Sequence, residues 1–212
     1  MIEDLDAFIA RNTTEVALDD GTRVRIRPIR PDDKEALARA AERASPETRY
    51  RRFMGPVDKL SAAQLRYLTE IDYLDHFAWV ALALDEDGTP GVGVARYVRD
   101  KEEPSAAEAA VAVVDDHQGR GLGTLLLEAL ALRAAENGIK RFRGVALASN
   151  EQIHELLRHV GAQISPPSQG EVSFELELPG RIDELRKTPL YWAMRQAARA
   201  AQPLFRHPRR RS

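Results

Sequence analysis

The stretch Gln118-Gly119-Arg120-Gly121-Leu122-Gly123 constrains this chain more than any other, because three alternating glycines lie between two apolar runs. Upstream, residues 109–114 are uniformly apolar, which is typical of a buried strand. Downstream, leucines and alanines recur at helical spacing. Glycines let a backbone approach an anion closely, and the free N–H groups at a helix start attract it. The order strand, glycine loop, helix therefore predicts a site for a diphosphate.

Two common glycine loops do not fit this stretch. A P-loop ends in Gly-Lys-Ser/Thr, but this loop continues as Gly123-Thr124-Leu125 without a lysine. A dinucleotide fingerprint has a third glycine where this chain has Thr124, and it normally follows the first strand of a domain. A glycine-rich turn that binds no ligand stays open as the structural alternative.

The composition is that of an ordinary globular protein. The 212 residues suffice for one domain with a substantial core. The formal net charge of −2 gives no reason to expect a nucleic-acid partner. Because the chain has no long apolar run and no secretory signal, we expect a cytoplasmic protein without a membrane partner. The absence of cysteine excludes disulfides and thiolate metal sites, and we expect no metal.

Hydrophobic periodicity predicts strands and helices throughout the chain. Asp20-Gly21 predicts the turn of a hairpin over 16–29, Pro31 a helix start, and Ser61 with Gln64 a capping box. Further strands are expected over 77–84, 91–98, 107–114, 141–147 and 172–178, and further helices after the glycine loop, from Asn150 to Gly161 and over 190–201.

Three strings carry a family resemblance. The form Gln-x-x-Gly-x-Gly at 118–123, after a strand, resembles the coenzyme A loop of the GCN5-related N-acetyltransferases, the GNAT superfamily. The strings at 45–54 and 67–77 are similar to the acetyltransferase domain of bacterial protein lysine acetyltransferases of the mycobacterial cyclic-AMP-dependent type. Only about 15 residues precede the hairpin here, too few for a cyclic-nucleotide domain, so we expect no direct control by cyclic AMP.

The resemblance implies an α/β (α+β) GNAT fold, in which helices flank a central, mostly antiparallel mixed sheet and a splayed parallel pair holds acetyl-CoA. We divide the chain into an N-terminal extension (1–15), a GNAT domain (16–180), a C-terminal helix (181–202) and a basic tail (203–212). The implied reaction acetylates a lysine ε-amine on a protein partner, with acyl-CoA synthetases as candidate targets. The implied acetyl-CoA-binding residues are Val111, Ala112, Val113, Gln118, Gly119, Arg120, Gly121, Leu122, Gly123, Thr124 and Asn150.

Glu108 is the candidate catalytic base, and it begins the apolar run that leads to the glycine loop. We expect its carboxylate to be half-buried, and an apolar environment makes a carboxylate more basic. The resemblance places the catalytic glutamate of the lysine acetyltransferases at this position. The alternative is a solvated glutamate at a strand start, like Glu102 and Glu103 nearby.

Other site residues have structural alternatives that the sequence leaves open. Arg120 adds charge for the phosphates or is solvated, and Thr124 contacts a phosphate or caps its helix. Asn150 contacts the pantetheine arm, caps its helix, or does both. Many family members place a tyrosine seven residues after this asparagine as an acid for the leaving thiolate, but this chain has Leu157 there. Its spacing with Ile153 predicts a core residue, so we assign no general acid.

The absence of cysteine also bears on the reaction. Without a cysteine to carry the acyl group, direct attack by the amine within a ternary complex is favoured. Two other functions stay open. One is an acetyltransferase for a small amine or a protein N-terminus, because the segments that select the acceptor are poorly constrained. The other is a non-catalytic protein that senses acyl-CoA and regulates a partner.

Overall fold

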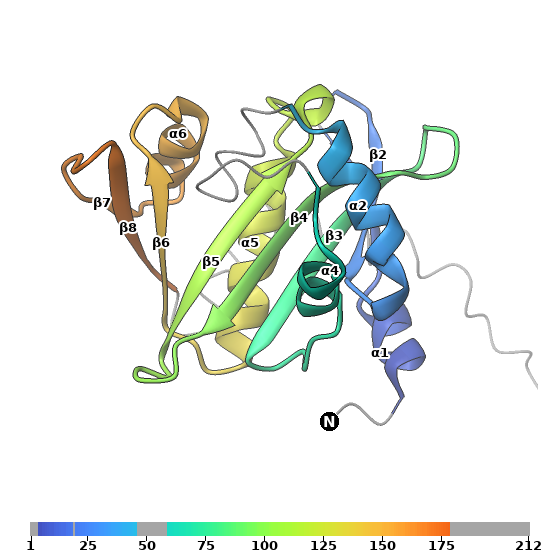
Figure 1. The fold of residues 1–212 in the computed structure, drawn as a ribbon, viewed down its shortest axis with the longest axis horizontal. Coiled ribbons are helices and arrows are strands. Elements are labelled where there is room, and N and C mark those ends of the chain that lie inside the picture. The colour runs from blue at the N-terminus through green and yellow to red at the C-terminus, as the bar shows by residue number, and fades with distance from the viewer. Residues whose placement is uncertain (1–3, 19, 46–58, 179–212) are drawn as a thin grey trace, which may run out of the picture.

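An eight-stranded sheet runs through the part of the chain that the computed structural model describes, which is residues 4–18, 20–45 and 59–178. The strands lie in the order β1-β2-β3-β4-β5-β6-β8-β7 (Figure 1). Every neighbouring pair is antiparallel except β5 and β6, which are parallel. The mostly antiparallel mixed sheet expected from the sequence is therefore confirmed.

The strands are β1 (Thr14–Ala17), β2 (Arg23–Pro28), β3 (His76–Ala83), β4 (Gly91–Arg99), β5 (Ala106–Val113), β6 (Arg141–Leu147), β7 (Gln163–Ile164) and β8 (Glu171–Glu177). All but β7 follow the alternation or apolar runs seen in the sequence. β7 was not predicted, because two residues are too few to show a period.

Helices cover both faces of the sheet (Figure 1). α5 (Leu122–Glu136) packs along one face against β3, β4 and β5, and α1 (Leu5–Arg11) contacts β2. α2 (Lys34–Arg43) and α4 (Ala62–Thr69) lie together on the other face. α6 (Glu151–His159) follows β6 and contacts β7. The sheet is thus the middle layer between helices.

The strand β5 has two different faces. Ala107, Ala109 and Val111 pack into the main core with the leucines of α5. Side chains alternate along a strand, so Glu108 and Ala112 point to the opposite face. Ala112 lies there with residues of α2, lining an apolar cavity of about 90 Å³.

Several local signals in the sequence are confirmed. The hairpin of β1 and β2 turns at Gly21, whose φ is +86°. In the capping box, Gln64 N donates to Ser61 Oγ at 3.2 Å and Ser61 N donates to Gln64 Oε1 at 2.8 Å. Gly138 and Gly161, with φ of +80° and +79°, follow the ends of α5 and α6. These signals act within a few residues, which is why sequence alone identifies them.

Other expectations fall on parts of the chain outside the described residues. They are the C-terminal helix within 181–202, the basic tail 203–212 and most of the family-like string 45–54. Among the described helices, none combines the length and the apolar character that crossing a membrane requires.

Candidate active site

The strands β5 and β6 separate after a short parallel ladder. Their register pairs Ala106–Glu108 with Arg141–Arg143. Beyond that, β5 stays paired with β4 as far as Val113, and β6 stays paired with β8 as far as Leu147. The remaining part of β5, residues 109–113, flanks a gap about 16 Å long at 3.3 Å per residue. The splayed parallel pair expected from the sequence is confirmed.

The glycine loop has the backbone that an anion cradle needs. Gly119 and Gly121 have φ of +71° and +80°, in the left-handed region that favours glycine. The N–H groups of Gly119, Arg120 and Gly121 donate to no acceptor among the described residues. Gly121 is also the N-cap of α5, and no side chain caps the first turn at Leu122–Thr124. These donors, with the positive end of a 15-residue helix, fit a diphosphate.

Two side chains tie the glycine loop to the rest of the fold. Gln118 Nε2 donates to the Val113 carbonyl at 3.0 Å, which holds the loop against the end of β5. Arg120 Nη1 donates to Thr22 Oγ1 at 3.2 Å and pairs with Asp20 Oδ2 at 3.2 Å. The guanidinium of Arg120 is therefore engaged by the β1–β2 turn.

The other residues expected to bind acetyl-CoA flank the same gap. Val111–Val113 are half-buried along its β5 side. Leu122 is 1% exposed, so only its N–H can reach a ligand. Asn150 Oδ1 accepts from Ile153 N at 3.3 Å, so this asparagine caps α6 just after β6 ends. Leu157 is also 1% exposed, which confirms it as a core residue.

Glu108 lies at the narrow end of the gap, in the last pair of the ladder. The expectation of a half-buried carboxylate is wrong, because this side chain points away from the core beneath α5 and is exposed. Its carboxylate makes no hydrogen bond or ion pair with any described residue. A groove of about 780 Å³ runs past it, lined also by Val98, Arg143 and Glu175. The Glu108 carboxylate therefore faces the groove without a partner among the described residues.

Comparison with known proteins agrees with this geometry. The family described as "Acetyltransferase (GNAT) domain" matches residues 23–163. The chain belongs to the GNAT acetyltransferase family. It is similar to Acetyltransferase Pat of Mycolicibacterium smegmatis, with 37% identity over 155 residues, 73% of this chain and 45% of that protein. Acetyltransferase PA5475 of Pseudomonas aeruginosa is 37% identical over 164 residues, 76% of this chain and 88% of that protein.

Solved structures show the same GNAT fold. The GNAT domain of S. lividans PAT superposes with a TM-score of 0.72 at 33% identity, covering 78% of this chain and 97% of that one. A cAMP-binding acyltransferase from Mycobacterium smegmatis gives a TM-score of 0.62 at 31% identity, covering 93% of this chain and 58% of that one. The chain therefore spans only about half the length of the M. smegmatis proteins. Acetyltransferases of the GNAT family use acetyl-CoA.

Two basic residues share the face of the sheet that carries Glu108: His76, which belongs to the family-like string 67–77, and Arg96 on β4. In the sheet register, His76, Val98 and Glu108 form one row across β3, β4 and β5. Arg96 Nη1 lies 3.0 Å from His76 Nε2, and Arg96 Nη2 donates to the Leu68 carbonyl at 3.2 Å. Burial and the Arg96 charge lower the pKa of His76 to about 4, so its ring is neutral at pH 7. The apolar and polar alternation within each strand does not indicate this contact between Arg96 and His76, because it joins two neighbouring strands.

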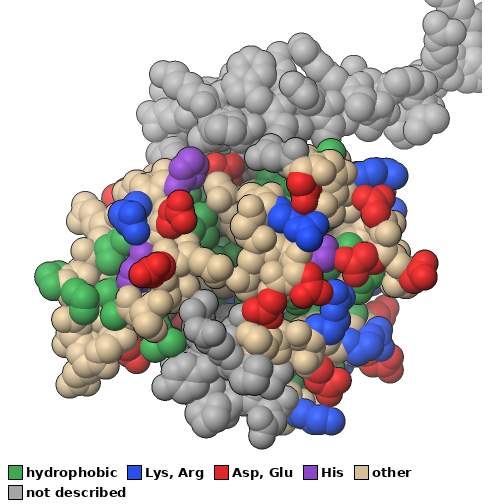
Figure 2. Space-filling view, turned by 90° about the horizontal axis from the view of Figure 1, so that it is seen from above, with side chains coloured by type: hydrophobic (Ala, Val, Ile, Leu, Met, Phe, Trp, Pro, Cys, Tyr) green, Lys and Arg blue, Asp and Glu red, His purple; other side chains and the backbone are tan. Residues whose placement is uncertain are grey.

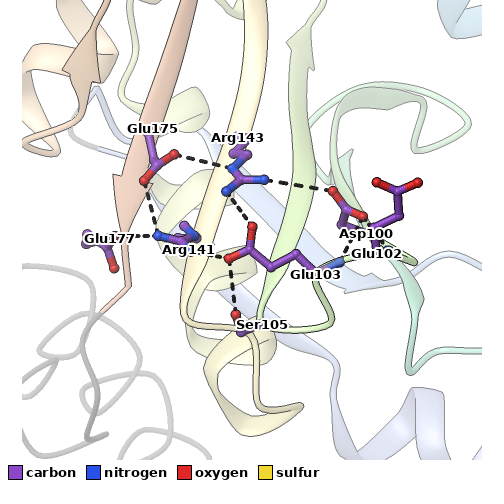
Figure 3. Close-up of polar contacts among 8 residues, drawn as sticks. All are labelled: Asp100, Glu102, Glu103, Ser105, Arg141, Arg143, Glu175 and Glu177. Carbon is purple, nitrogen blue, oxygen red and sulfur yellow. Dashed lines mark hydrogen bonds and ion pairs between the residues drawn. The ribbon is translucent and has the colours of Figure 1, made fainter.

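A cluster of arginines and carboxylates, which the sequence analysis did not identify, joins β6 to β8 and to the loop ahead of β5 (Figure 3). Arg141 and Arg143 on β6 pair with Glu103 ahead of β5 and with Glu175 on β8. Hydrogen bonds from Arg141 first, and then from Arg143, lower the pKa of Glu103. The alternation Arg-x-Arg on one strand and Glu-x-Glu, ending at Glu177, on another is the one sequence signal that could have indicated it.

The end of the GNAT domain to which β5 points carries charges of both signs. Figure 2 shows this end, with acidic and basic side chains interspersed over its described surface. Among the described residues, no group of three or more His, Asp or Glu side chains is arranged to hold a metal ion.

Proposed function

We propose that this chain transfers the acetyl group of acetyl-CoA to the ε-amine of a lysine on a protein, with Glu108 as the base. The observation that carries the proposal is the free, exposed carboxylate of Glu108 at the narrow end of the β5–β6 gap. The similarity to proteins named Pat supports a protein acceptor. Acyl-CoA synthetases are the targets that we propose to test first, since acetylation of a catalytic lysine removes its charge.

The glycine loop and the gap divide the binding of acetyl-CoA between them. The N–H groups of Gly119–Thr124 would hold the diphosphate, and the β5 edge at Val111–Val113 would hold the pantetheine arm and the acetyl carbonyl. Asn150 lies at the opposite edge, where β6 ends. Its side-chain oxygen is used by the helix cap, which leaves its amide N–H groups for the arm. Thr124, in the first turn of α5, would add its hydroxyl to the phosphates.

The acceptor amine needs a base. A free lysine has a pKa of about 10.4, so roughly one in 2,500 is neutral at pH 7. The amine nitrogen attacks the thioester carbonyl carbon, the C–S bond breaks, and coenzyme A leaves as a thiolate. Glu108 takes the amine proton, directly or through one water. The thiolate leaves without a protein acid, because a thiol pKa is about 8.5 and Leu157 is buried in the core.

The domain boundaries are part of the proposal. We propose that residues 16–180 form the catalytic domain, with 181–202 and 203–212 outside it. Phe8 and Ile9 of α1 are buried in the same hydrophobic core, so the N-terminal segment packs against the domain that follows.

The test compares Glu108→Gln with wild type and with a matched control, Glu102→Gln, which changes an exposed loop glutamate nearby. Lysates are incubated with each protein and labelled acetyl-CoA, and modified sites are located by mass spectrometry. We expect lysine ε-labelling by wild type and the control, a loss of about 100-fold in Glu108→Gln, and unchanged coenzyme A binding by calorimetry. Labelled polyamines or protein N-termini would overturn the lysine assignment. A wild type that binds but never transfers would identify a sensor instead.

A further inference from the structure

Arg143 lies beside Glu108 but does not pair with it. The two residues are in register at the last position of the β5–β6 ladder, so their side chains leave the sheet on the same face. Neighbouring strands lie about 4.8 Å apart, which is well within the reach of an arginine side chain. Yet no ion pair joins the Arg143 guanidinium to Glu108, and the guanidinium instead pairs with carboxylates that come from two other segments (Figure 3).

Three carboxylates hold the Arg143 guanidinium. Glu103 Oε2 accepts from Arg143 Nη2 at 2.6 Å, which is the shortest of these contacts. Glu175 Oε2 accepts from Nε at 3.3 Å, and Asp100 Oδ2 lies 3.9 Å from Nη1. Glu103 is itself fixed by Arg141, which bonds its other carboxylate oxygen. Glu103 is therefore the strongest single restraint on the direction of Arg143.

The direction of this guanidinium matters for a base. An arginine placed on a carboxylate favours the charged form and occupies its lone pairs, which makes the carboxylate a weaker proton acceptor. The other two carboxylates that line the groove, Asp100 and Glu175, lie 3.9 and 3.3 Å from nitrogens of the Arg143 guanidinium, whereas Glu108 makes no ion pair with a described residue. On this surface, therefore, the Glu108 carboxylate is unpaired, whereas the carboxylates of the cluster around Arg143 are paired.

We propose that Glu103 is a positioning residue, which holds the Arg143 guanidinium away from Glu108 and so keeps the base free to accept the proton of the acceptor amine. This inference rests on the proposed function for its effect on rate, but the placement of the guanidinium does not depend on it. Glu103 touches neither substrate nor reacting atoms; it acts through Arg143.

The first measurement is independent of turnover. The side-chain carboxyl carbon of Glu108 is followed by NMR against pH in wild type and in Glu103→Ala, with Glu108→Gln to assign the resonance. We expect the titration midpoint to move to lower pH in Glu103→Ala, because Arg143 is released onto its neighbour. We expect the titration midpoint to return to its wild-type value in Glu103→Ala/Arg143→Gln, where the Arg143 guanidinium is absent. An unchanged midpoint in Glu103→Ala would overturn the proposal.

The second measurement is the pH profile of acetyl transfer. Glu103→Ala should lower kcat/KM about tenfold on the plateau and move the acid limb to lower pH, and the double variant should recover most of the rate. If Glu103 had only a structural role, the double variant would have a lower kcat/KM than Glu103→Ala. Glu177→Gln, which removes a 3.5 Å contact with Arg141 alone, is the matched control and should leave the profile unchanged. If Glu103→Ala does not fold, Glu103→Gln keeps the shape of the side chain and is tested in the same two ways.

The two proposals fail differently. A shifted midpoint with no change of rate in either Glu103→Ala or Glu108→Gln would retain the positioning of Arg143 and overturn Glu108 as base. If both variants lower the rate but the Glu108 titration midpoint is unchanged in Glu103→Ala, Glu108 is retained as the base and the positioning role of Glu103 is overturned.

Discussion

Arg120 in the glycine loop is held by Asp20 in the β1–β2 turn, with 3.2 Å between guanidinium and carboxylate. The two residues are far apart in the sequence, and both side chains are about 40% exposed. An anion bound in the loop would therefore compete with Asp20 for the charge of Arg120. The hairpin turn thus contributes to the electrostatics of the site that we propose for acetyl-CoA.

Removing the charge of Asp20 should strengthen coenzyme A binding. Asp20→Asn keeps an oxygen for the turn bond from Thr22 N, 2.9 Å long in the wild type, and frees Arg120 for the phosphates. An exposed ion pair is weak, so we expect the Kd for coenzyme A to fall only about two- to threefold at low salt, and less at high salt. Calorimetry at two ionic strengths measures the Kd for coenzyme A and its dependence on salt. Asp87→Asn, in an equivalent Asp-Gly turn, should have no effect; equal changes in both variants would contradict the prediction.

Gly144 follows the last pair of the β5–β6 ladder, and a side chain there has no room. A Cβ would collide with the ring of Phe174 and lie 3.1 Å from the Ala109 carbonyl oxygen. Gly144→Ala should therefore destabilise the fold by about 1–3 kcal/mol and weaken coenzyme A binding, because the edges of the gap must shift. Gly91→Ala, whose Cβ would meet Ala40 at an ordinary 3.8 Å, is the control for thermal unfolding. A Gly144→Ala protein as stable as that control would contradict the prediction.

A buried ion pair joins β2 to the start of α2. Arg27 donates two bonds of 2.7 Å to Asp33, and the two side chains are 11% and 10% exposed. Asp33→Asn leaves the guanidinium without its counter-charge, and we expect a loss of about 3–5 kcal/mol in the free energy of unfolding. Glu35→Gln breaks a solvated helix pair with Arg39 and should cost less than about 0.5 kcal/mol. Urea unfolding measures the loss of unfolding free energy in both variants. Similar losses in Asp33→Asn and Glu35→Gln would contradict the prediction that the buried ion pair contributes more than the exposed one.

The sequence predicted the features that depend on a few consecutive residues. The glycine loop, the Ser61 and Gln64 capping box and the Asn150 cap each need only a turn of chain, and all three are found. The family resemblance supplied what these local signals lack, namely the parallel pair that opens beside the loop.

The remaining features depend on which strands are neighbours. Glu108 is exposed because its face of β5 looks away from α5, and the sequence around it is apolar on both faces. Arg143 meets Glu103 and Glu175 only once β6 lies between β5 and β8. Contacts of this kind join residues more than 30 positions apart, which no periodicity within one segment can indicate.

His76 should make the stability of the fold depend on pH. Burial and then the Arg96 charge lower its pKa from 6.5 to about 4, partly offset by Asp72. Above pH 6.5 the ring is neutral in both states and the full stability is present. Between pH 6.5 and 4 the unfolded chain binds a proton that the folded chain refuses, so stability falls as the pH falls. We expect the thermal midpoint of wild type to drop more steeply over this range than that of His76→Gln, which has no proton to bind. NMR should also show a neutral His76 ring at pH 5.5. A His76 titration midpoint near pH 6.5 would contradict the prediction, as would an equal fall of the thermal midpoint with pH in the two proteins.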